Sequence, residues 1–374
     1  MGMTQYGSLW KKERRYLSKA LSGAPIVKRN YSGLMMKRAT ILLKGILDRP
    51  QDFLWEVKKM TGHVVIEVGY GAIGDDEDGG HDYIDMQIEL GIITAKTVQG
   101  YWVDFFPWLK HIPTWFPGAQ FKRDGLRWGK QYDTVRDYMF ERIKKRVLSA
   151  DQGESLPPSF VRSTLRDLYA KPPSDPEELK EDEDAIKYAS FSFYRAGADT
   201  TESAVKSFLL TMSLYPEFQA KAREEIDRVI GPDRLPSIED RGTDKMPYME
   251  AVTLEALRWN PAAGSGTFMS RDPAYYTNAT DFNPERFLIV DEKTSSVAFN
   301  KATLDPREYA FGFGRRICPG IDMTVQEMWI ALVFILWAFE IRKKGEGKWD
   351  VDEERFTFAF TSYVARFACA AGLV

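Results

Sequence analysis

The sequence contains little cysteine and little histidine. Among its 374 residues there are two cysteines, Cys318 and Cys369, and three histidines. Two cysteines exclude a disulfide framework and indicate a reducing compartment. The histidines, His63, His81 and His111, are not spaced as metal ligands, so a metal bound through histidine is disfavoured.

The chain also lacks a long hydrophobic run and a strong net charge. Its most apolar segment, residues 329–339 (WIALVFILWAF), is far shorter than the roughly 20 residues that span a bilayer, so we expect a buried helix. Residues 1–6 contain no apolar run, so we expect the chain to have neither a signal peptide nor a membrane anchor. The formal net charge of −3 argues against a nucleic-acid-binding protein.

What is present is an ordinary globular composition, 44% hydrophobic and 28% charged. Helical periodicity dominates and strand signals are few and short, so we expect one mainly α (α+β) domain over residues 1–374. Residues 9–59 hold 13 Lys/Arg against 4 Asp/Glu, a local charge of +9. Two acidic runs, residues 75–78 and 174–184, are predicted to be solvated loops.

One glycine pattern resembles a dinucleotide-binding motif, but its surroundings argue against such a site. Residues 69–74 (GYGAIG) fit G-x-G-x-x-G after an apolar run. A dinucleotide site needs a helix starting at the last glycines, whose N-terminus holds the pyrophosphate. Here the acidic run 75–78 follows and would repel phosphate. We therefore expect a glycine-rich turn that ends an apolar helix.

Residues 311–320 (FGFGRRICPG) place Cys318 in a glycine-rich loop that leads into the apolar helix. Glycine has no Cβ, so a flat ligand can approach the backbone closely. Arg316 adds a fixed positive charge. A thiolate in such a loop is one of the few ways in which a protein holds haem iron. A buried structural thiol is the alternative interpretation of an isolated cysteine.

Residues 196–201 (AGADTT) lie inside a helical pattern that runs from about residue 184 to 214. Glycine and paired threonines are poor choices for a helix interior, and such exceptions mark functional sites. Gly197 would admit a ligand, and Thr200 would bond a carbonyl one turn back and open the helix locally. A helix merely bent by Ser/Thr packing is the plainer alternative.

The loop motif resembles the Phe-x-x-Gly-x-Arg-x-Cys-x-Gly signature of the cytochrome P450 family, with Phe311, Arg316 and Cys318 at its specified positions. The resemblance implies haem b with Cys318 as axial thiolate. Residues 196–201 are similar to the family's oxygen-binding helix. There Asp199 and Thr200 would organise water that delivers protons. Arg195 departs from the small residue that is usual before this stretch.

Two further motifs carry the resemblance. Glu255 and Arg258 are similar to the family's Glu-x-x-Arg pair, which would close a buried structural triad with Arg286 of residues 284–287 (PERF). Outside that context, the pair is a helix-surface ion pair of little worth.

Trp10 and Arg14 are similar to the family's Trp-x-x-x-Arg helix, in which they bind a haem propionate. An exposed basic helix explains the same residues. Their neighbours Lys11, Lys12, Arg15 and Lys19 would form a positive face that either docks an acidic electron donor or only adds solubility.

Parts of the family pattern are missing. The chain starts at the Trp10 helix, without the family's anchor and first elements. Only 25 residues separate Arg258 from Pro284, about half of what is usual for the family. The resemblance, closest to a fungal group that includes O-methylsterigmatocystin oxidoreductase, therefore implies a truncated cytochrome P450 that lacks part of the sheet.

The implied reaction inserts one oxygen atom of O2 into a small apolar substrate, in secondary metabolism or xenobiotic oxidation, with electrons from NADPH–cytochrome P450 reductase. The family resides on the endoplasmic reticulum membrane; without an anchor the chain would be cytosolic. Three alternatives stay open: a non-catalytic remnant that binds haem weakly or not at all, a peroxide-using haem-thiolate enzyme, and a cysteine nucleophile paired with a distant histidine.

Overall fold

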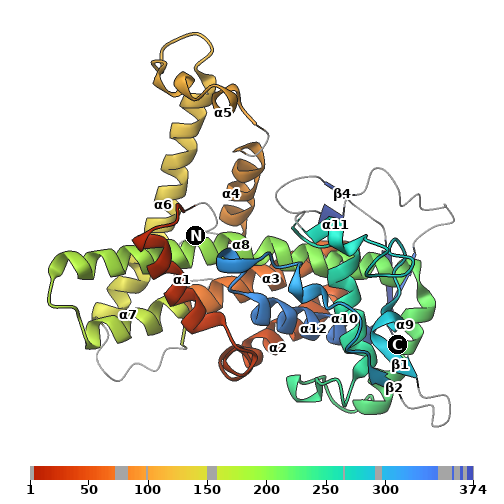
Figure 1. Cartoon of the computed structure of the whole chain (residues 1–374). Coiled ribbons are helices and arrows are strands. Elements are labelled where there is room, and N and C mark those ends of the chain that lie inside the picture. The colour runs from red at the N-terminus through yellow and green to blue at the C-terminus, as the bar shows by residue number, and fades with distance from the viewer. Residues whose placement is uncertain are drawn as a thin grey trace. The chain divides into compact units, whose positions relative to one another are not determined.

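The structure, a computed structural model, describes residues 4–71, 83–97, 100–149, 158–263, 266–290, 297–343, 356–357, 363–364 and 369–373. The chain divides into two compact units (Figure 1). The first unit comprises Met1–Leu17 and Val65–Arg195, and the second comprises Ser18–Val64 and Ala196–Val374. The mainly helical architecture confirms the predicted fold class.

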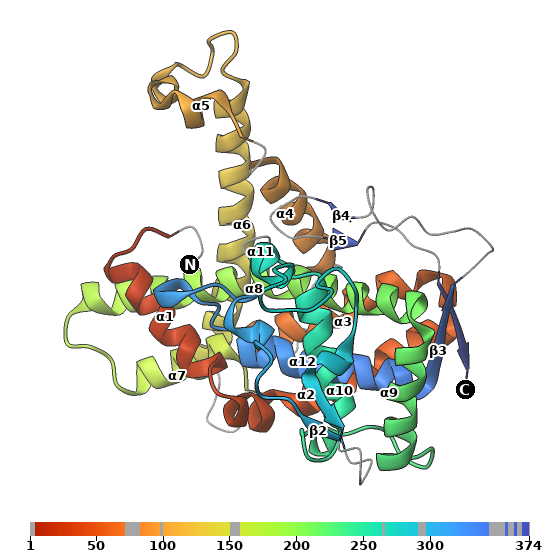
Figure 2. The same cartoon turned by 45° about the vertical axis from the view of Figure 1, so that its right-hand side comes forward.

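The first unit is a set of helices in which α5 lies at one end of the long helix α6, as Figures 1 and 2 both show. Buried side chains join α4 to α8: the Gln87 amide donates to Tyr194 O at 2.9 Å, and the Tyr194 hydroxyl donates to Tyr83 O at 2.6 Å. Its helices are α1 (Ser8–Leu21) as far as Leu17, α3 (Phe53–Tyr70) from Val65 onward, α4 (Tyr83–Thr97), α5 (Trp102–Phe105), η2 (Pro107–His111), α6 (Gln120–Ser149), α7 (Phe160–Ala170) and α8 (Pro176–Leu214) as far as Arg195.

The second acidic run is not a loop, and that prediction was wrong. Helix α8 begins at Pro176, with Glu177 and Glu178 in its first turn. Proline suits a first helical position, and carboxylates there are stabilised by the helix dipole. Asp182 is buried and pairs with Lys12 at 3.0 Å. The acidic residues therefore start a helix instead of solvating a turn. The first acidic run, residues 75–78, lies outside the described residues.

The second unit is built around α12, which is buried along nearly its whole length and packs against α2, α9 and α10. This confirms the predicted buried helix, although its last predicted residue, Phe339, already begins β3. Among the described residues α12 is the one helix long and apolar enough to cross a bilayer, and most of it is buried. The helices are the end of α1 from Ser18, α2 (Ala24–Asp48), η1 (Pro50–Asp52), α3 as far as Val64, the rest of α8, α9 (Pro216–Val229), η3 (Ile238–Asp240), α10 (Pro247–Trp259), α11 (Thr267–Ser270), η5 (Pro284–Phe287), η6 (Pro306–Glu308), η7 (Gly314–Arg316) and α12 (Ile321–Ala338).

The strands confirm the expectation of short, sparse β-structure. In the described parts of the chain they form three antiparallel pairs, β1–β2, β3–β6 and β4–β5. In the longest, Phe339 pairs with Leu373 and Lys343 with Cys369. The strands are β1 (Leu288–Val290), β2 (Val297–Phe299), β3 (Phe339–Lys343), β4 (Phe356–Thr357), β5 (Tyr363–Val364) and β6 (Cys369–Leu373).

In its described part, the glycine-rich stretch of residues 69–74 forms the predicted turn at the end of a helix. Helix α3 ends at Tyr70, and Gly71 follows with φ +94° while its N–H donates to Glu67 O. Such a left-handed residue after a helix is a common C-terminal cap. Residues 72–82 lie outside the described residues.

Candidate haem and active site

The Cys318 loop is shaped by its own backbone. The N–H of Cys318 donates to Phe311 O at 2.9 Å, which closes the loop. Gly312 and Gly314 have φ of +78° and +60°, a region that residues with a Cβ rarely adopt. These two glycines let the chain turn back within seven residues and bring the cysteine to the start of α12.

The sulfur of Cys318 lies where backbone dipoles favour a negative charge. Gly320 N–H points to Sγ at 3.4 Å, and α12 begins at the next residue, Ile321. The N-terminus of a helix carries partial positive charge, so it stabilises a thiolate. Cys318 is half-buried and is not joined in a disulfide. Both features suit a metal-binding thiolate better than an inert core thiol.

The loop has room for a flat ligand. A Cβ added at Gly312 or Gly314 would meet no other atom within 4 Å. Phe313 and Arg316 are exposed beside them. The donor set, one thiolate and an arginine on a side-chain-poor loop, therefore fits haem iron with its acidic propionates.

The Gly197 stretch lies on α8, which is longer than predicted because it starts at residue 176. The Thr200 hydroxyl donates to Ala196 O at 2.9 Å, as expected, and that of Thr201 donates to Gly197 O at 3.0 Å. Residues 176–214 are nevertheless one continuous helix, so the predicted local opening is not seen. Ala196 is exposed and Gly197 is half-exposed, which leaves this side of the helix accessible.

The predicted triad residues come together in the second unit. Arg258 Nε donates to Glu255 at 2.6 Å, and Arg286 Nε lies 3.2 Å from the same carboxylate. The side chains of Glu255 and Arg258 are fully buried. The Asn283 N–H also donates to Glu255, at 2.7 Å. A single carboxylate thus accepts hydrogen bonds from two arginines and fixes the turn before η5.

Backbone carbonyls complete the cluster, and sequence reasoning missed them. Arg258 Nη1 donates to Ser270 O and Ala279 O, both at 2.7 Å, and Nη2 donates to Asp281 O at 2.8 Å. Every N–H of this guanidinium therefore has an acceptor, as a buried charge requires. Every residue has a backbone carbonyl, whatever its side chain. The sequence therefore does not indicate that these three residues take part.

Trp10 and Arg14 belong to the first unit and lie one turn apart on α1. Trp10 is 5% exposed, with its ring 5.0 Å from that of Tyr6. Residues four apart share a helix face, which is the arrangement that the motif predicts. The remaining predicted haem-site residues belong to the second unit.

The positive face predicted around α1 is partly neutralised. Lys12 pairs with Glu181 and Asp182, both at 3.0 Å, and Arg15 lies 3.8 Å from Asp182. Burial acts to lower the pKa of Lys12, but the hydrogen bonds that Lys12 donates to these two carboxylates, together with their negative charges, raise it above the ordinary value. Two of the four cations thus hold α8 in the first unit, so the face offers less charge to a partner than the sequence suggested.

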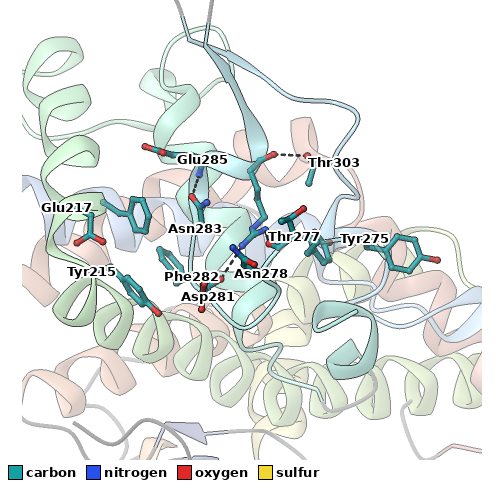
Figure 3. Close-up of a pocket in the computed structure, with 13 residues that line it drawn as sticks. Tyr215, Glu217, Tyr275, Thr277, Asn278, Asp281, Phe282, Asn283, Glu285 and Thr303 are labelled. Atoms are coloured by element: carbon teal, nitrogen blue, oxygen red, sulfur yellow. Dashed lines mark hydrogen bonds between the residues drawn. The ribbon is translucent and has the colours of Figure 1, made fainter. Parts of the chain in front are cut away.

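A separate cavity of about 610 Å³ opens in the second unit beside the triad (Figure 3). Figure 3 shows Asn283 accepting the Glu285 N–H, and the Thr303 hydroxyl donates to Arg286 O at 2.7 Å. Among the described residues neither Cys318 nor Thr200 lines it. Its lining residues are Tyr215, Glu217, Phe218, Tyr275, Tyr276, Thr277, Asn278, Asp281, Phe282, Asn283, Glu285, Arg286 and Thr303.

Comparison with known proteins fits this geometry. A sequence model of the family described as cytochrome P450 matches residues 3–268 and 265–366. The chain therefore belongs to the cytochrome P450 family, whose members hold haem through a cysteine thiolate.

Curated fungal relatives cover nearly the whole chain. Cytochrome P450 monooxygenase 208 of Postia placenta is 35% identical over 92% of this chain and 68% of its own length. Cytochrome P450 monooxygenase claR of Ampulloclitocybe clavipes is 31% identical over 93% of this chain and 66% of its own. Tryptamine 4-monooxygenase of Psilocybe cyanescens is 29% identical over 99% of this chain and 75% of its own.

Proposed function

We propose that this chain is a haem-thiolate monooxygenase that inserts one oxygen atom of O2 into a small apolar substrate. The observation that carries the proposal is the position of Cys318, half-buried in an open glycine loop at the N-terminus of α12. Membership of the cytochrome P450 family supports it. Relatives named as monooxygenases of fungi support a role in secondary metabolism.

The protein would hold haem b between the Cys318 loop and the side of α8 that carries Gly197. Bound haem supplies the activation of O2 that no side chain can perform. Cys318 would supply the thiolate ligand of the iron, and Phe311 and Gly197 would help to hold the haem. Arg316 is assigned to a propionate, and the family resemblance assigns Trp10 and Arg14 likewise.

Asp199 and Thr200 are the proposed proton-handling residues. The Thr200 hydroxyl already donates to Ala196 O, so its oxygen is left to accept a hydrogen bond from water. Asp199, the half-buried residue directly before it on α8, would supply a carboxylate to the same water. A carboxylate and a hydroxyl beside ordered water form a proton relay. The electrons would come from NADPH–cytochrome P450 reductase, as the family implies.

The carbon monoxide difference spectrum of the purified, reduced protein tests the proposal. The wild type should give the absorption band of a thiolate-bound haem, and Cys318→Ala should abolish it, since no other cysteine motif is present. Cys369→Ala is the matched control; the side chain of Cys369 lies outside the described residues, and we expect the band to persist. A full-intensity band in Cys318→Ala would overturn the assignment.

A non-catalytic remnant is the second candidate, and two observations favour it. The family's sequence model matches this chain in two stretches that meet at residues 265–268. This junction lies in the interval from Arg258 to Pro284, which is shorter than is usual for the family. Phe268, at this junction, is 89% exposed, as expected where covering structure is missing. A chain that folds but shows no haem absorbance after reconstitution would establish the remnant.

We further propose that the first unit binds the surface of a membrane. Residues 102–116, around α5 and η2, expose six large aromatic side chains, of which Trp102 and Trp115 are 73% and 77% exposed. Amphipathic aromatic rings favour the bilayer interface. Co-sedimentation with phosphatidylcholine vesicles should therefore fall markedly in the double variant Trp102→Ser/Trp115→Ser; unchanged sedimentation would contradict membrane binding. The exposed aromatic residues are Trp102, Phe105, Phe106, Trp108, Trp115 and Phe116.

A further inference from the structure

Arg195 carries a charge that the described part of the chain does not neutralise. It precedes Ala196 directly on α8, where a small residue was expected. Its Nη2 donates to the hydroxyl of Thr94 on α4, and its guanidinium lies 5.0 Å from the ring centre of Tyr132 on α6. Among the described residues, no carboxylate pairs with Arg195, and Nη1 is buried without an acceptor.

The neighbours of Arg195 have no further acceptor to give. The Thr94 hydroxyl donates its one proton to Leu90 O at 2.8 Å and lies 2.6 Å from the Tyr132 hydroxyl. A cation over an aromatic ring gains about 0.5–2 kcal/mol, which is less than an unsatisfied buried charged donor loses. The site thus lacks a negatively charged acceptor at Nη1.

Other arginines in the structure show what a completed site requires. Arg136, on α6, likewise lies over a ring, at 4.7 Å from the centre of Tyr188. It also pairs with Asp133 at 2.7 Å and Asp137 at 2.9 Å. Arg195 has the same aromatic support and a hydroxyl, but lacks the carboxylate. What distinguishes Arg195 is therefore the missing anion, which a ligand can supply.

We propose that Arg195, positioned by Thr94 and the ring of Tyr132, binds a carboxylate of the substrate through Nη1. This deepens the proposed function and rests on it, because Arg195 immediately precedes the stretch assigned to O2 and proton handling. The substrate is then an apolar molecule that carries one carboxylate, not a wholly apolar one. A single guanidinium suits a singly charged carboxylate, whereas a phosphate calls for more donors.

Calorimetric titration of the purified holoprotein tests this without turnover. The probes are naphthalene-2-carboxylate, its neutral isostere naphthalene-2-carboxamide, and 2-naphthyl phosphate. The wild type should prefer the carboxylate to the amide by about tenfold, equivalent to about 1.4 kcal/mol. A water-filled site would bind both equally, and tighter binding of the phosphate would overturn the carboxylate assignment.

Three variants locate the preference. Arg195→Gln should remove it, Arg195→Lys should retain part of it because the charge remains, and Arg136→Gln, the matched control, should leave it unchanged. A preference that survives in Arg195→Gln, or that disappears equally in Arg136→Gln, contradicts the site.

The carbon monoxide spectrum, recorded on the same samples, separates this site from the proposed function. The haem-thiolate band should persist in all three variants. A carboxylate preference without that band in the wild type overturns the monooxygenase alone. The band without the preference overturns the carboxylate site alone.

Discussion

The Glu255 cluster and the Cys318 loop both contain charged and polar groups of the second unit, but the surroundings of these groups differ. In the cluster, Glu255, Arg258 and Arg286 satisfy one another and draw on backbone carbonyls. In the loop, the backbone fixes the shape while open space surrounds Gly312 and Gly314. Groups that are satisfied within the chain stabilise the fold, whereas groups beside open space are available to a ligand. Substitutions should therefore separate stability from chemistry.

The largest expected effect is on stability and comes from the cluster. Arg258→Leu would leave the buried Glu255 carboxylate with only the Asn283 N–H and the longer contact to Arg286, so we expect the free energy of unfolding to fall by about 3–5 kcal/mol. Chemical denaturation followed by circular dichroism measures it. Arg342→Leu, which removes the partner of Glu340 in an exposed pair, is the control and should change little. Equal losses in the two variants would contradict the comparison.

The next largest expected effect is on catalytic turnover, with the stability of the fold unchanged. Thr200→Ala removes a half-buried hydroxyl from α8 and should lower NADPH-dependent turnover by about a hundredfold, while the carbon monoxide band and the unfolding midpoint persist. Thr201→Ala, which removes the adjacent buried hydroxyl, should affect turnover far less. Activity that depends on added peroxide should survive in Thr200→Ala. Turnover with NADPH at the wild-type rate would rule out a proton-handling role for Thr200.

The smallest effect concerns Glu327, a carboxyl buried in α12. Burial raises its pKa well above the ordinary value, and its Oε1 is without a hydrogen-bond partner. Burial therefore favours the protonated form in the folded protein more than in the unfolded chain. Because the unfolded chain ionises this group near pH 4.3, its ionisation favours unfolding as the pH rises above that value. The contribution of Glu327 to the free energy of unfolding is therefore fully present in acid, and it is lost as the pH rises.

Glu327→Gln removes that titration. We expect the variant to gain at least about 1.4 kcal/mol of unfolding free energy relative to the wild type at pH 8, and little at pH 4.5. Denaturation at the two pH values measures the difference. A gain of the same size at both values would show that packing, not ionisation, is responsible.

Local patterns predicted several elements correctly. The apolar run of residues 329–339 predicted a buried helix, and α12 is buried because its residues are apolar all round. Paired threonines predicted a hydroxyl bond to a carbonyl one turn back, which Thr200 makes. These features depend on residues within a turn or two of each other, so the sequence is sufficient to reveal them.

Long-range features escaped this reasoning. Residues 174–184 were assigned to a solvated loop because a run of carboxylates looks the same in a loop and in the first turns of a helix. Lys12, about 170 residues away, determines that Asp182 is buried and paired. The same distance effect hid the ion pairs that reduce the positive face on α1.

The sequence by itself determined which residues are chemically capable: one cysteine among glycines, a carboxylate beside two threonines, and the Glu-x-x-Arg pair. Only the tertiary structure decided which of their groups are already satisfied. It supplies the carbonyls of Ser270, Ala279 and Asp281 to Arg258, but the described residues offer no acceptor to Nη1 of Arg195. The physical reason is that desolvation and hydrogen bonding depend on what packs against a group, and packing joins residues that are distant along the chain.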